Sequence, residues 1–263
     1  MITNLDRALE TWREWGLALR ERPRLVGPVP GGLTNRNYRL NAPGAGQDLL
    51  LRIHHPRSES LGIDRSAERI ILTHVGEHGI GRPALYWDPS ARFTVFEWLQ
   101  GRAWTPADFA RADQRARLWP LLERLAKVSP DLPRRRYHTY LSHYWQQLDR
   151  GDGVENELRE AWQAFEPRLR AFDRSDWPVR LVHHDLVPAN VLDAGGRLVL
   201  IDWEYAALGH PDIDVWSLAP ERCGEPFVAE MMGWVNALWE RLVGVTGWPS
   251  AGAGFWRSPD SVQ

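Results

Sequence analysis

One stretch of this chain decides its fold: His183-His184-Asp185-Leu186-Val187-Pro188-Ala189-Asn190, followed twelve residues later by Asp202 in Leu200-Ile201-Asp202-Trp203-Glu204. Phosphoryl transfer from a magnesium nucleotide asks little covalent chemistry of a protein and much alignment and charge neutralisation. In this spacing Asp185 can accept a hydroxyl proton, while Asn190 and Asp202 can hold the metal that bridges the phosphates. The stretch therefore predicts a loop and a hairpin that supply both a base and a metal clamp.

The residues around this stretch favour short strands. Residues 179–182 are apolar enough for a buried strand, and residues 190–193 and 197–201 read as a hairpin turned by Ala194-Gly195-Gly196. Asp202 then follows the second strand of the hairpin and faces the loop. The predicted strands would therefore bring Asp185, Asn190 and Asp202 together as a candidate site.

Two other interpretations of the same residues remain open. An aspartate five residues before an asparagine is common in loops, where both side chains cap backbone groups. His183, His184 and Asp185 could also ligate the metal of a metallohydrolase, although the sequence shows no obvious second histidine cluster. The combination of the loop, the Gly-Gly hairpin and Asp202 favours phosphoryl transfer.

With Ile201-Asp202-Trp203-Glu204-Tyr205-Ala206, the stretch resembles the aminoglycoside phosphotransferase and choline kinase superfamily, and its choline kinase and thiamine kinase branches are the most similar. The resemblance implies that Asp185 is the catalytic base and that His183 supports the loop. It also implies that Asn190 and Asp202 are Mg²⁺ ligands. Asp214 matches the family's downstream structural aspartate.

The composition is that of a globular protein with a small-molecule partner. The 263 residues are 43% hydrophobic and 25% charged, with a formal net charge of −2. A net charge of this size provides no positive electrostatic potential that would attract nucleic acid, so we expect no nucleic-acid partner. No apolar run approaches the ~20 residues of a membrane span, and the first residues lack a signal peptide, so we expect no membrane insertion and a cytoplasmic location. The single cysteine, Cys223, excludes an internal disulfide.

The pattern predicts an α+β, two-lobed, protein-kinase-like fold. Residues 1–99 would form the nucleotide-binding lobe, a small antiparallel sheet with one main helix, and residues 100–263 the larger, mostly helical lobe for catalysis and substrate binding. The expected strands of the first lobe are 24–29, 37–40, 48–53, 84–88 and 93–98, and its expected helices are 5–19 and 64–78. The expected helices of the second lobe are 106–128, 139–148, 156–172 and 228–243.

Several residues of the first lobe are candidates for nucleotide binding. Gly31-Gly32-Leu33-Thr34-Asn35 lies between two expected strands, where glycines allow a tight turn and Thr34 and Asn35 can meet phosphate oxygens. A glycine turn between two strands is usually only structural. The motif at residues 183–202 favours a phosphate-binding role for this one. Residues 93–101 resemble the family's hinge, whose backbone groups contact adenine; ATP is therefore the implied phosphoryl donor, and no side chain there excludes GTP.

Arg52 interrupts an otherwise apolar strand, Leu49-Leu50-Leu51-Arg52-Ile53. Burying an unpaired guanidinium is costly, so Arg52 must meet an anion or reach solvent. The only lysine is Lys127, so an arginine must take the phosphate-binding place that a lysine usually has in such a lobe. We predict that Glu68 on the next helix orients Arg52 toward the phosphates; a surface ion pair is the alternative.

The acceptor is an alcohol whose identity the sequence constrains least. Among the 15 tryptophans, Trp203 and Trp216 follow the motif, and their faces, with Glu204, could surround a cation such as choline or thiamine. Tryptophans at helical spacing more often fill core space. An acidic run could instead serve an aminoglycoside or sugar kinase, or be solvated helix surface; it comprises Asp149, Asp152, Glu155, Glu157 and Glu160.

These observations predict a Mg²⁺- and ATP-dependent kinase that phosphorylates the hydroxyl of a small, cationic metabolite. A noncatalytic nucleotide-binding module with the same fold is the alternative from another class, because the expected lysine is missing. Only 49 residues follow Asp214, so the part of the chain that completes an acceptor pocket is short.

Overall fold

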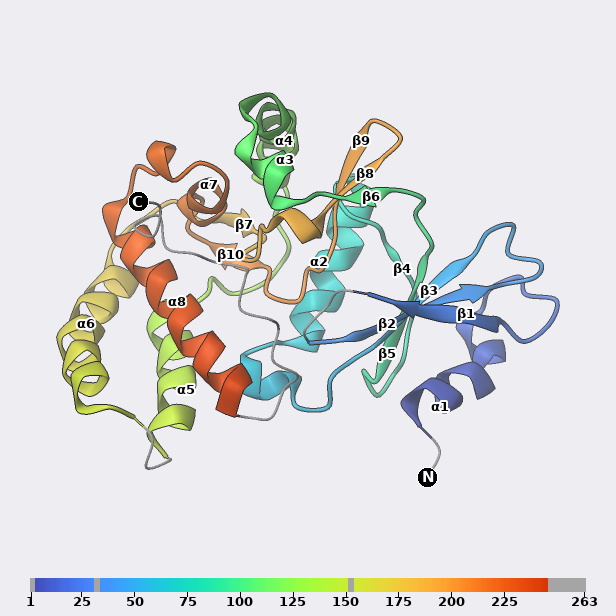
Figure 1. Ribbon diagram of the computed structural model, residues 1–263, viewed down its shortest axis with the longest axis horizontal. Helices are drawn as coiled ribbons and strands as arrows, with labels where there is room; N and C mark the ends of the chain where they lie inside the picture. The colour runs from blue at the N-terminus through green and yellow to red at the C-terminus, as the bar shows by residue number, and fades with distance from the viewer. Residues whose placement is uncertain (1–2, 31–33, 151–153, 246–263) are drawn as a thin grey trace.

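The computed structural model describes residues 3–30, 34–150 and 154–245 (Figure 1). A five-stranded antiparallel sheet in the order β1-β2-β3-β5-β4 occupies one side, and helices dominate the other. The strands of the sheet are β1 (Arg24–Val29), β2 (Arg36–Asn41), β3 (Leu49–Ile53), β4 (Ala84–Trp87) and β5 (Phe93–Glu97). All five strands lie where the sequence predicts them, because each is a short apolar run bounded by turn residues.

Helix α2 (Arg65–Glu77) packs on the sheet and faces the rest of the chain. Asp64 caps its first turn, accepting hydrogen bonds from the backbone N–H groups of Ser66 (2.9 Å) and Ala67 (3.0 Å). Ile71 and Val75 on its buried face are fully enclosed. Glu68 is buried on the same helix, which places a carboxylate beside β3.

The described residues of the second part of the chain form six further α-helices and two small sheets. The helices with their bounds are α4 (Ala112–Leu125), α5 (Tyr137–Asp149), α6 (Asn156–Arg174), α7 (Asp212–Leu218) and α8 (Pro226–Val245), preceded by the short α3 (Pro106–Ala110). One small sheet pairs β7 (Arg180–Val182) with β10 (Ala207–Gly209), and the other has the order β6-β8-β9, formed by Arg102–Ala103, Val191–Ala194 and Arg197–Leu200. Strands β6 and β10 and helix α7 were not predicted. No described helix is long and apolar enough to cross a membrane.

Two of the predicted helices are wrong in extent. The expected helix 5–19 is α1 (Asn4–Glu10) followed by a 3₁₀ turn at Trp12–Trp15, because the Thr11 hydroxyl donates back to the Arg7 carbonyl and Gly16 takes a left-handed conformation (φ 67°). The expected helix 106–128 divides into α3 and α4 at Arg111, whose backbone is extended. The division of the chain after residue 99 remains a prediction.

One hydrophobic cluster joins the sheet to the helical part. It combines Leu50 and Phe96 of the sheet, Ile71 of α2, and Leu200 and Trp203 of the motif region, each at most 4% exposed. Burial of apolar surface is the main stabilising term in folding, so this cluster holds the motif against β3 and α2. It thereby sets the distance between Arg52 and Asp202.

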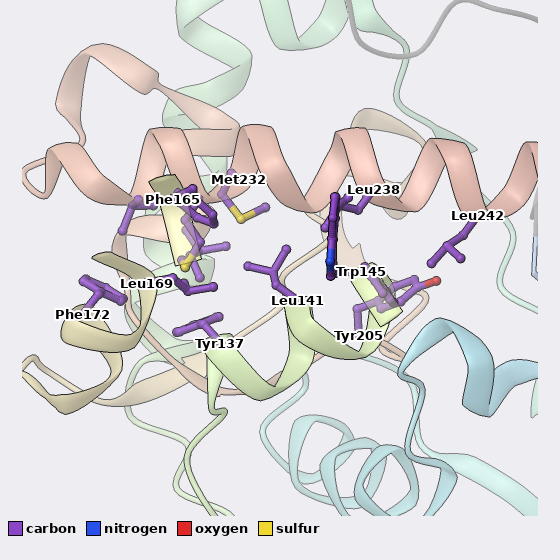
Figure 2. Close-up of a cluster of buried hydrophobic side chains, with 14 of the residues drawn as sticks. Tyr137, Leu141, Trp145, Phe165, Leu169, Phe172, Tyr205, Met232, Leu238 and Leu242 are labelled. Carbon is purple, nitrogen blue, oxygen red and sulfur yellow. The ribbon is translucent and has the colours of Figure 1, made fainter. Parts of the chain in front are cut away.

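A second cluster fills the space between α5, α6 and α8 (Figure 2). Trp145 and Trp162 stack within it at 5.0 Å between ring centroids. Leu141 is fully buried at its centre. The tryptophans of these helices mainly fill core space, as the sequence left open.

Replacing Leu141 with alanine tests this core. We expect Leu141→Ala to lower the free energy of unfolding by about 2–5 kcal/mol, because the side chain is lost and a cavity remains. Ile70→Ala is the matched control, since Ile70 is 37% exposed on α2, and its effect should stay below about 0.5–1 kcal/mol. Equal midpoints of urea unfolding for the two variants would contradict the assignment of this core.

Candidate active site

The loop after β7 is fixed by a buried carboxylate. Asp214 of α7 accepts hydrogen bonds from the backbone N–H groups of His183 (2.8 Å) and His184 (3.1 Å). His184 has a left-handed backbone (φ 63°), which such paired bonds stabilise. The His183 Nε2 lies 3.0 Å from the Ile201 carbonyl oxygen, and its ring packs against Trp203 at 4.6 Å between centroids. These contacts join the loop to α7 and to the end of β9, and the supporting role of His183 in catalysis stays a prediction.

Asp185 lies at the far end of this loop and touches Asn190. The Asn190 Nδ2 donates to the Asp185 Oδ2 at 2.8 Å and to the Asp185 carbonyl oxygen at 2.9 Å. Burial, followed by the negative charges of Asp202 and Glu204, raises the pKa of Asp185 to about 7. A carboxylate whose pKa is close to neutral can both accept and release a proton at physiological pH.

Arg52 of β3 contacts carboxylates of α2 and of the motif. Its Nη1 lies 3.2 Å from the Glu68 Oε1 and 3.3 Å from the Asp202 Oδ1. Arg52 is 4% exposed, so these carboxylates provide the anions that a buried guanidinium needs. The predicted pair of Arg52 with Glu68 is present, and Asp202 is an additional partner that the sequence pattern did not indicate.

The carboxylate of Asp202 has properties that suit a metal ligand. It follows β9 in a left-handed conformation (φ 65°), and its Oδ1 is buried without a hydrogen-bond donor, although the Arg52 cation is near. A hard oxygen atom of this kind fits Mg²⁺, and the role of Asn190 as a second ligand stays a prediction. Bound there, Mg²⁺ would neutralise charge on the phosphates of a nucleotide.

A histidine-based metal site does not form. The ring of His184 lies beside the Tyr137 hydroxyl, at 3.0 Å from Nε2, while the ring of His183 faces Ile201 and Trp203. Within residues 3–30, 34–150 and 154–245, no group of three or more His, Cys, Asp and Glu side chains could hold a metal ion. The metallohydrolase interpretation therefore has no support in the described residues.

Glu204 connects Thr34 and Asn35, which precede β2, to the motif. Its carboxylate accepts hydrogen bonds from the Thr34 hydroxyl and from the Asn35 Nδ2 (2.8 Å). Arg65 of α2 donates to the Glu204 Oε2 (3.0 Å), to the Glu68 Oε2 (2.6 Å) and to the Asn35 Oδ1 (3.0 Å). Thr34 and Asn35 are thus engaged by protein groups, and they anchor the loop that precedes β2.

The sequence analysis missed Arg65. Its position three residues before Glu68, on the same helical face, was the available signal. Gly31 and Gly32, which were predicted to cover the nucleotide, lie outside the described residues, so their role stays a prediction.

Removing the Glu204 carboxylate tests the anchoring role. We expect Glu204→Ala to weaken nucleotide binding about tenfold, because Thr34, Asn35 and Arg65 each lose a buried partner and the loop loosens. Glu204→Gln is the matched control, since its amide oxygen can still accept from Asn35. Calorimetric titration with ADP measures the effect. If the alanine variant binds ADP as tightly as the wild type does, Glu204 does not anchor Thr34 and Asn35 for nucleotide binding.

The three predicted substrate residues have different outcomes. Trp203 is 1% exposed, and its Nε1 donates to the Leu200 carbonyl oxygen at 3.0 Å. Its assignment to the substrate is corrected, because the ring fills the cluster that joins the two parts of the chain. Trp216 is partly buried against the cluster of α5, α6 and α8, and its substrate role stays a prediction. Glu204 contacts the glycine-turn loop, as described above.

Tyrosines that the sequence analysis did not single out lie near Asp185. The negative charge of Asp185 contributes to the raised pKa of both Tyr140 and Tyr205, although burial is the main cause. Trp239 of α8 donates to the Tyr205 hydroxyl at 2.9 Å. Both tyrosines are therefore near enough to Asp185 for its charge to act on them, and the Arg135 guanidinium lies over the Tyr140 ring at 4.4 Å from the centroid.

The acidic run of α6 does not gather at this site. Glu155, Glu157 and Glu160 are exposed, and Asp149 pairs with Arg159. Asp152 lies outside the described residues. The exposed members behave as solvated helix surface.

Comparison with known proteins gives one family and many related folds. Residues 26–250 match the phosphotransferase enzyme family, and comparison with curated proteins gives no match. The structure resembles a choline/ethanolamine kinase family protein from Mesorhizobium loti, with 19% identity, a TM-score of 0.66, and coverage of 93% of this chain and 87% of that one.

Two further solved structures were crystallised with nucleotides. LicA in complex with AMP has 19% identity and a TM-score of 0.71, with 92% of this chain and 91% of that one covered. A mutant aminoglycoside 2'-phosphotransferase-IIIa in complex with GDP has 16% identity and a TM-score of 0.53, with 91% and 86% covered. These similarities confirm the predicted α+β, kinase-like fold.

Proposed function

Because the chain belongs to the phosphotransferase enzyme family, we propose that it transfers the γ-phosphoryl group of Mg-ATP to a hydroxyl group of a small-molecule acceptor. The observation that carries the proposal is the meeting of four side chains from distant parts of the chain. Asn190 donates to Asp185 at 2.8 Å, and Arg52 lies 3.3 Å from Asp202. These contacts support the proposal, in which the two pairs would supply a base, metal-binding oxygens and a phosphate-binding cation.

Each of these residues has a defined task. Asp185 accepts the proton of the acceptor hydroxyl as the oxygen attacks phosphorus, and its pKa of about 7 suits that step. Asn190 orients the Asp185 carboxylate and, with Asp202, would hold Mg²⁺. Arg52 is fixed by Glu68 and is placed to contact the α- and β-phosphates.

The acceptor that these surroundings favour is a cation of the choline or thiamine type. Burial and then the charges of Asp202 and Glu204 raise the pKa of Asp185, and burial and then the charge of Asp202 raise the pKa of Glu204, so several carboxylates gather at the site. The Tyr140 ring already carries the Arg135 guanidinium, 4.4 Å from its centroid, so the preference for a cation rests on the carboxylates. The similarity to choline/ethanolamine kinase structures agrees with this class, and the similarity to aminoglycoside phosphotransferases keeps an amino sugar as the second candidate.

A noncatalytic nucleotide-binding module is less well supported. Its main argument was the missing lysine, and Arg52 occupies a buried position with two carboxylate partners. An arginine there could take the phosphate-binding place of the lysine.

Release of ADP from Mg-ATP in the presence of choline, ethanolamine, thiamine, glucosamine and kanamycin tests the proposal. We expect acceptor-dependent release with at least one amino alcohol or thiamine. Release only with glucosamine or kanamycin would reassign the acceptor. Nucleotide binding without any acceptor-dependent release, across this panel and related alcohols, would favour the noncatalytic module.

A further inference from the structure

Tyr137 contacts the candidate catalytic loop but has no role in the scheme above. It is the first residue of α5 and is 1% exposed. Its hydroxyl oxygen lies 3.0 Å from the Nε2 atom of His184, and it accepts a hydrogen bond from the backbone N–H group of His210 at 2.9 Å. His184 directly precedes Asp185, the candidate base. A side chain of the helical part of the chain therefore reaches the residue next to that base.

The geometry fixes the direction of each hydrogen bond around the His184 ring. The ring Nδ1 lies 3.2 Å from the carbonyl oxygen of Val182, which can only accept, so Nδ1 carries the hydrogen. Burial lowers the pKa of His184 well below its usual value, so the ring is neutral and Nε2 is an acceptor. Burial also raises the pKa of Tyr137, so its hydroxyl stays protonated and donates to Nε2. Both ring nitrogens of His184 are thereby engaged by protein groups.

The backbone of His184 adopts a conformation that needs support. It is left-handed (φ 63°), which favours glycine because a side chain crowds the backbone there. Such a conformation persists where surrounding contacts fix it. Asp214 binds the backbone N–H groups of this turn, and the two hydrogen bonds of the ring add to that support. The turn sets the direction in which Asp185 leaves the loop, so the position of the base depends on these contacts.

Tyr137 is itself held in place by α6 and β10. The carboxylate of Asp173, on α6, accepts hydrogen bonds from the backbone N–H groups of Tyr137 and His138, both at 2.9 Å. Gly209 of β10 lies against the contact between Tyr137 and His184. A side-chain carbon at Gly209 would lie 2.7 Å from the His184 Cε1 and would collide with the Tyr137 hydroxyl. Glycine at this position therefore permits the two side chains to meet.

We propose that Tyr137 is a positioning residue for the candidate base: its hydroxyl, bound to the His184 ring, holds the turn that carries Asp185. This inference rests on the proposed function, in which Asp185 accepts the proton of the acceptor hydroxyl. Tyr137 acts through His184 and not on the reacting atoms. It therefore affects the rate of phosphoryl transfer more than it affects the binding of nucleotide.

Tyr137→Phe tests this role, because it removes only the hydroxyl. The rate is measured as ADP release from Mg-ATP with the one of choline, ethanolamine, thiamine, glucosamine and kanamycin that gives the fastest wild-type release. A small misplacement of a reacting group can reduce a rate about 10²-fold, so we expect kcat to fall about ten- to a hundredfold. The KM for the acceptor and the dissociation constant for ADP should change less than about threefold.

Tyr144→Phe is the matched control on the same helix. Tyr144 is fully buried, and its hydroxyl donates to the carbonyl oxygen of Leu61, before α2, at 2.6 Å. Both variants lose a buried hydrogen bond, so we expect both thermal midpoints to fall. Only Tyr137→Phe should lower kcat. An equal loss of kcat in Tyr144→Phe would assign the effect to the packing of α5 and overturn the inference.

Replacing His184 with glycine separates positioning from packing. His184→Gly allows the left-handed turn without a ring, so Tyr137 has no partner to act through. In that background we expect Tyr137→Phe to lower the thermal midpoint but to change kcat less than about twofold. A loss of kcat of the same size in both backgrounds would overturn the inference, because Tyr137 would then act independently of His184.

The possible outcomes separate this inference from the proposed function. NMR of the labelled histidine nitrogens at neutral pH should show a neutral His184 ring with its hydrogen on Nδ1. A hydrogen on Nε2 would overturn the inference even if no variant folds. Wild-type kcat in Tyr137→Phe would also overturn it while the proposed function stands. A wild-type protein that binds ADP but releases none with any acceptor would refute the proposed function, and the inference with it.

Discussion

Asp185→Asn should abolish turnover while the protein keeps its nucleotide affinity. General-base catalysis contributes about 10²–10⁴-fold to a rate, and the asparagine amide cannot accept the hydroxyl proton. The size and shape of the side chain are retained, so contact with Asn190 remains possible. We expect kcat to fall at least about a hundredfold, with the dissociation constant for ADP changed less than about threefold.

The stability of the same variant provides an internal check. Asp185 is a partly buried carboxylate whose pKa is raised to about 7 by desolvation and by the charges of Asp202 and Glu204. A neutral amide removes that unfavourable charge, so the thermal midpoint should equal or exceed that of the wild type. Asp176→Asn, at an exposed aspartate, is the matched control and should leave kcat unchanged. Wild-type turnover in Asp185→Asn would remove Asp185 from catalysis.

Asp202→Asn should remove the dependence of nucleotide binding on Mg²⁺. Asparagine keeps the left-handed backbone at this position (φ 65°), which it tolerates better than alanine does. The carboxylate charge is lost, so we expect kcat/KM to fall by about 10²–10³. ADP affinity with magnesium should drop to the affinity measured in EDTA.

The control for this second variant lies on the same hairpin. Asp193 pairs with Arg117 at 2.8 Å on the solvent side, so Asp193→Asn keeps the local chain and should preserve the magnesium effect. Arg52 retains Glu68 when Asp202 is changed, so a folded protein is expected. A magnesium effect of wild-type size in Asp202→Asn would place the metal elsewhere.

Much of the first lobe could be predicted because its signals are local. The five strands are short apolar runs, and α2 begins at a capping aspartate, Asp64. The hairpin that carries Asp202 turns at Gly195 and Gly196, both left-handed (φ 66° and 89°), where glycine is favoured. Errors arose where a local signal was overridden, as at Thr11 and Arg111, which interrupt otherwise helical stretches.

The partners of the site residues could not be predicted in the same way. Glu204 was placed at the acceptor, yet it holds Thr34 and Asn35, about 170 residues earlier in the chain. Trp203 was placed at the acceptor and is instead core. Sequence spacing gives the residue types at the site but not which of them are already engaged by one another.

The sequence by itself determined the chemistry available to this protein: the spacing of Asp185, Asn190 and Asp202, and an arginine in an apolar strand. Side-chain periodicity and turn preferences depend on only a few neighbouring residues, so these features can be recognised in the sequence. Only the tertiary structure decided that Arg52 meets Asp202 and that Arg65 reaches Glu204. Those contacts depend on how the shared hydrophobic cluster packs the sheet, α2 and the hairpin together, and such packing is a property of all its side chains at once.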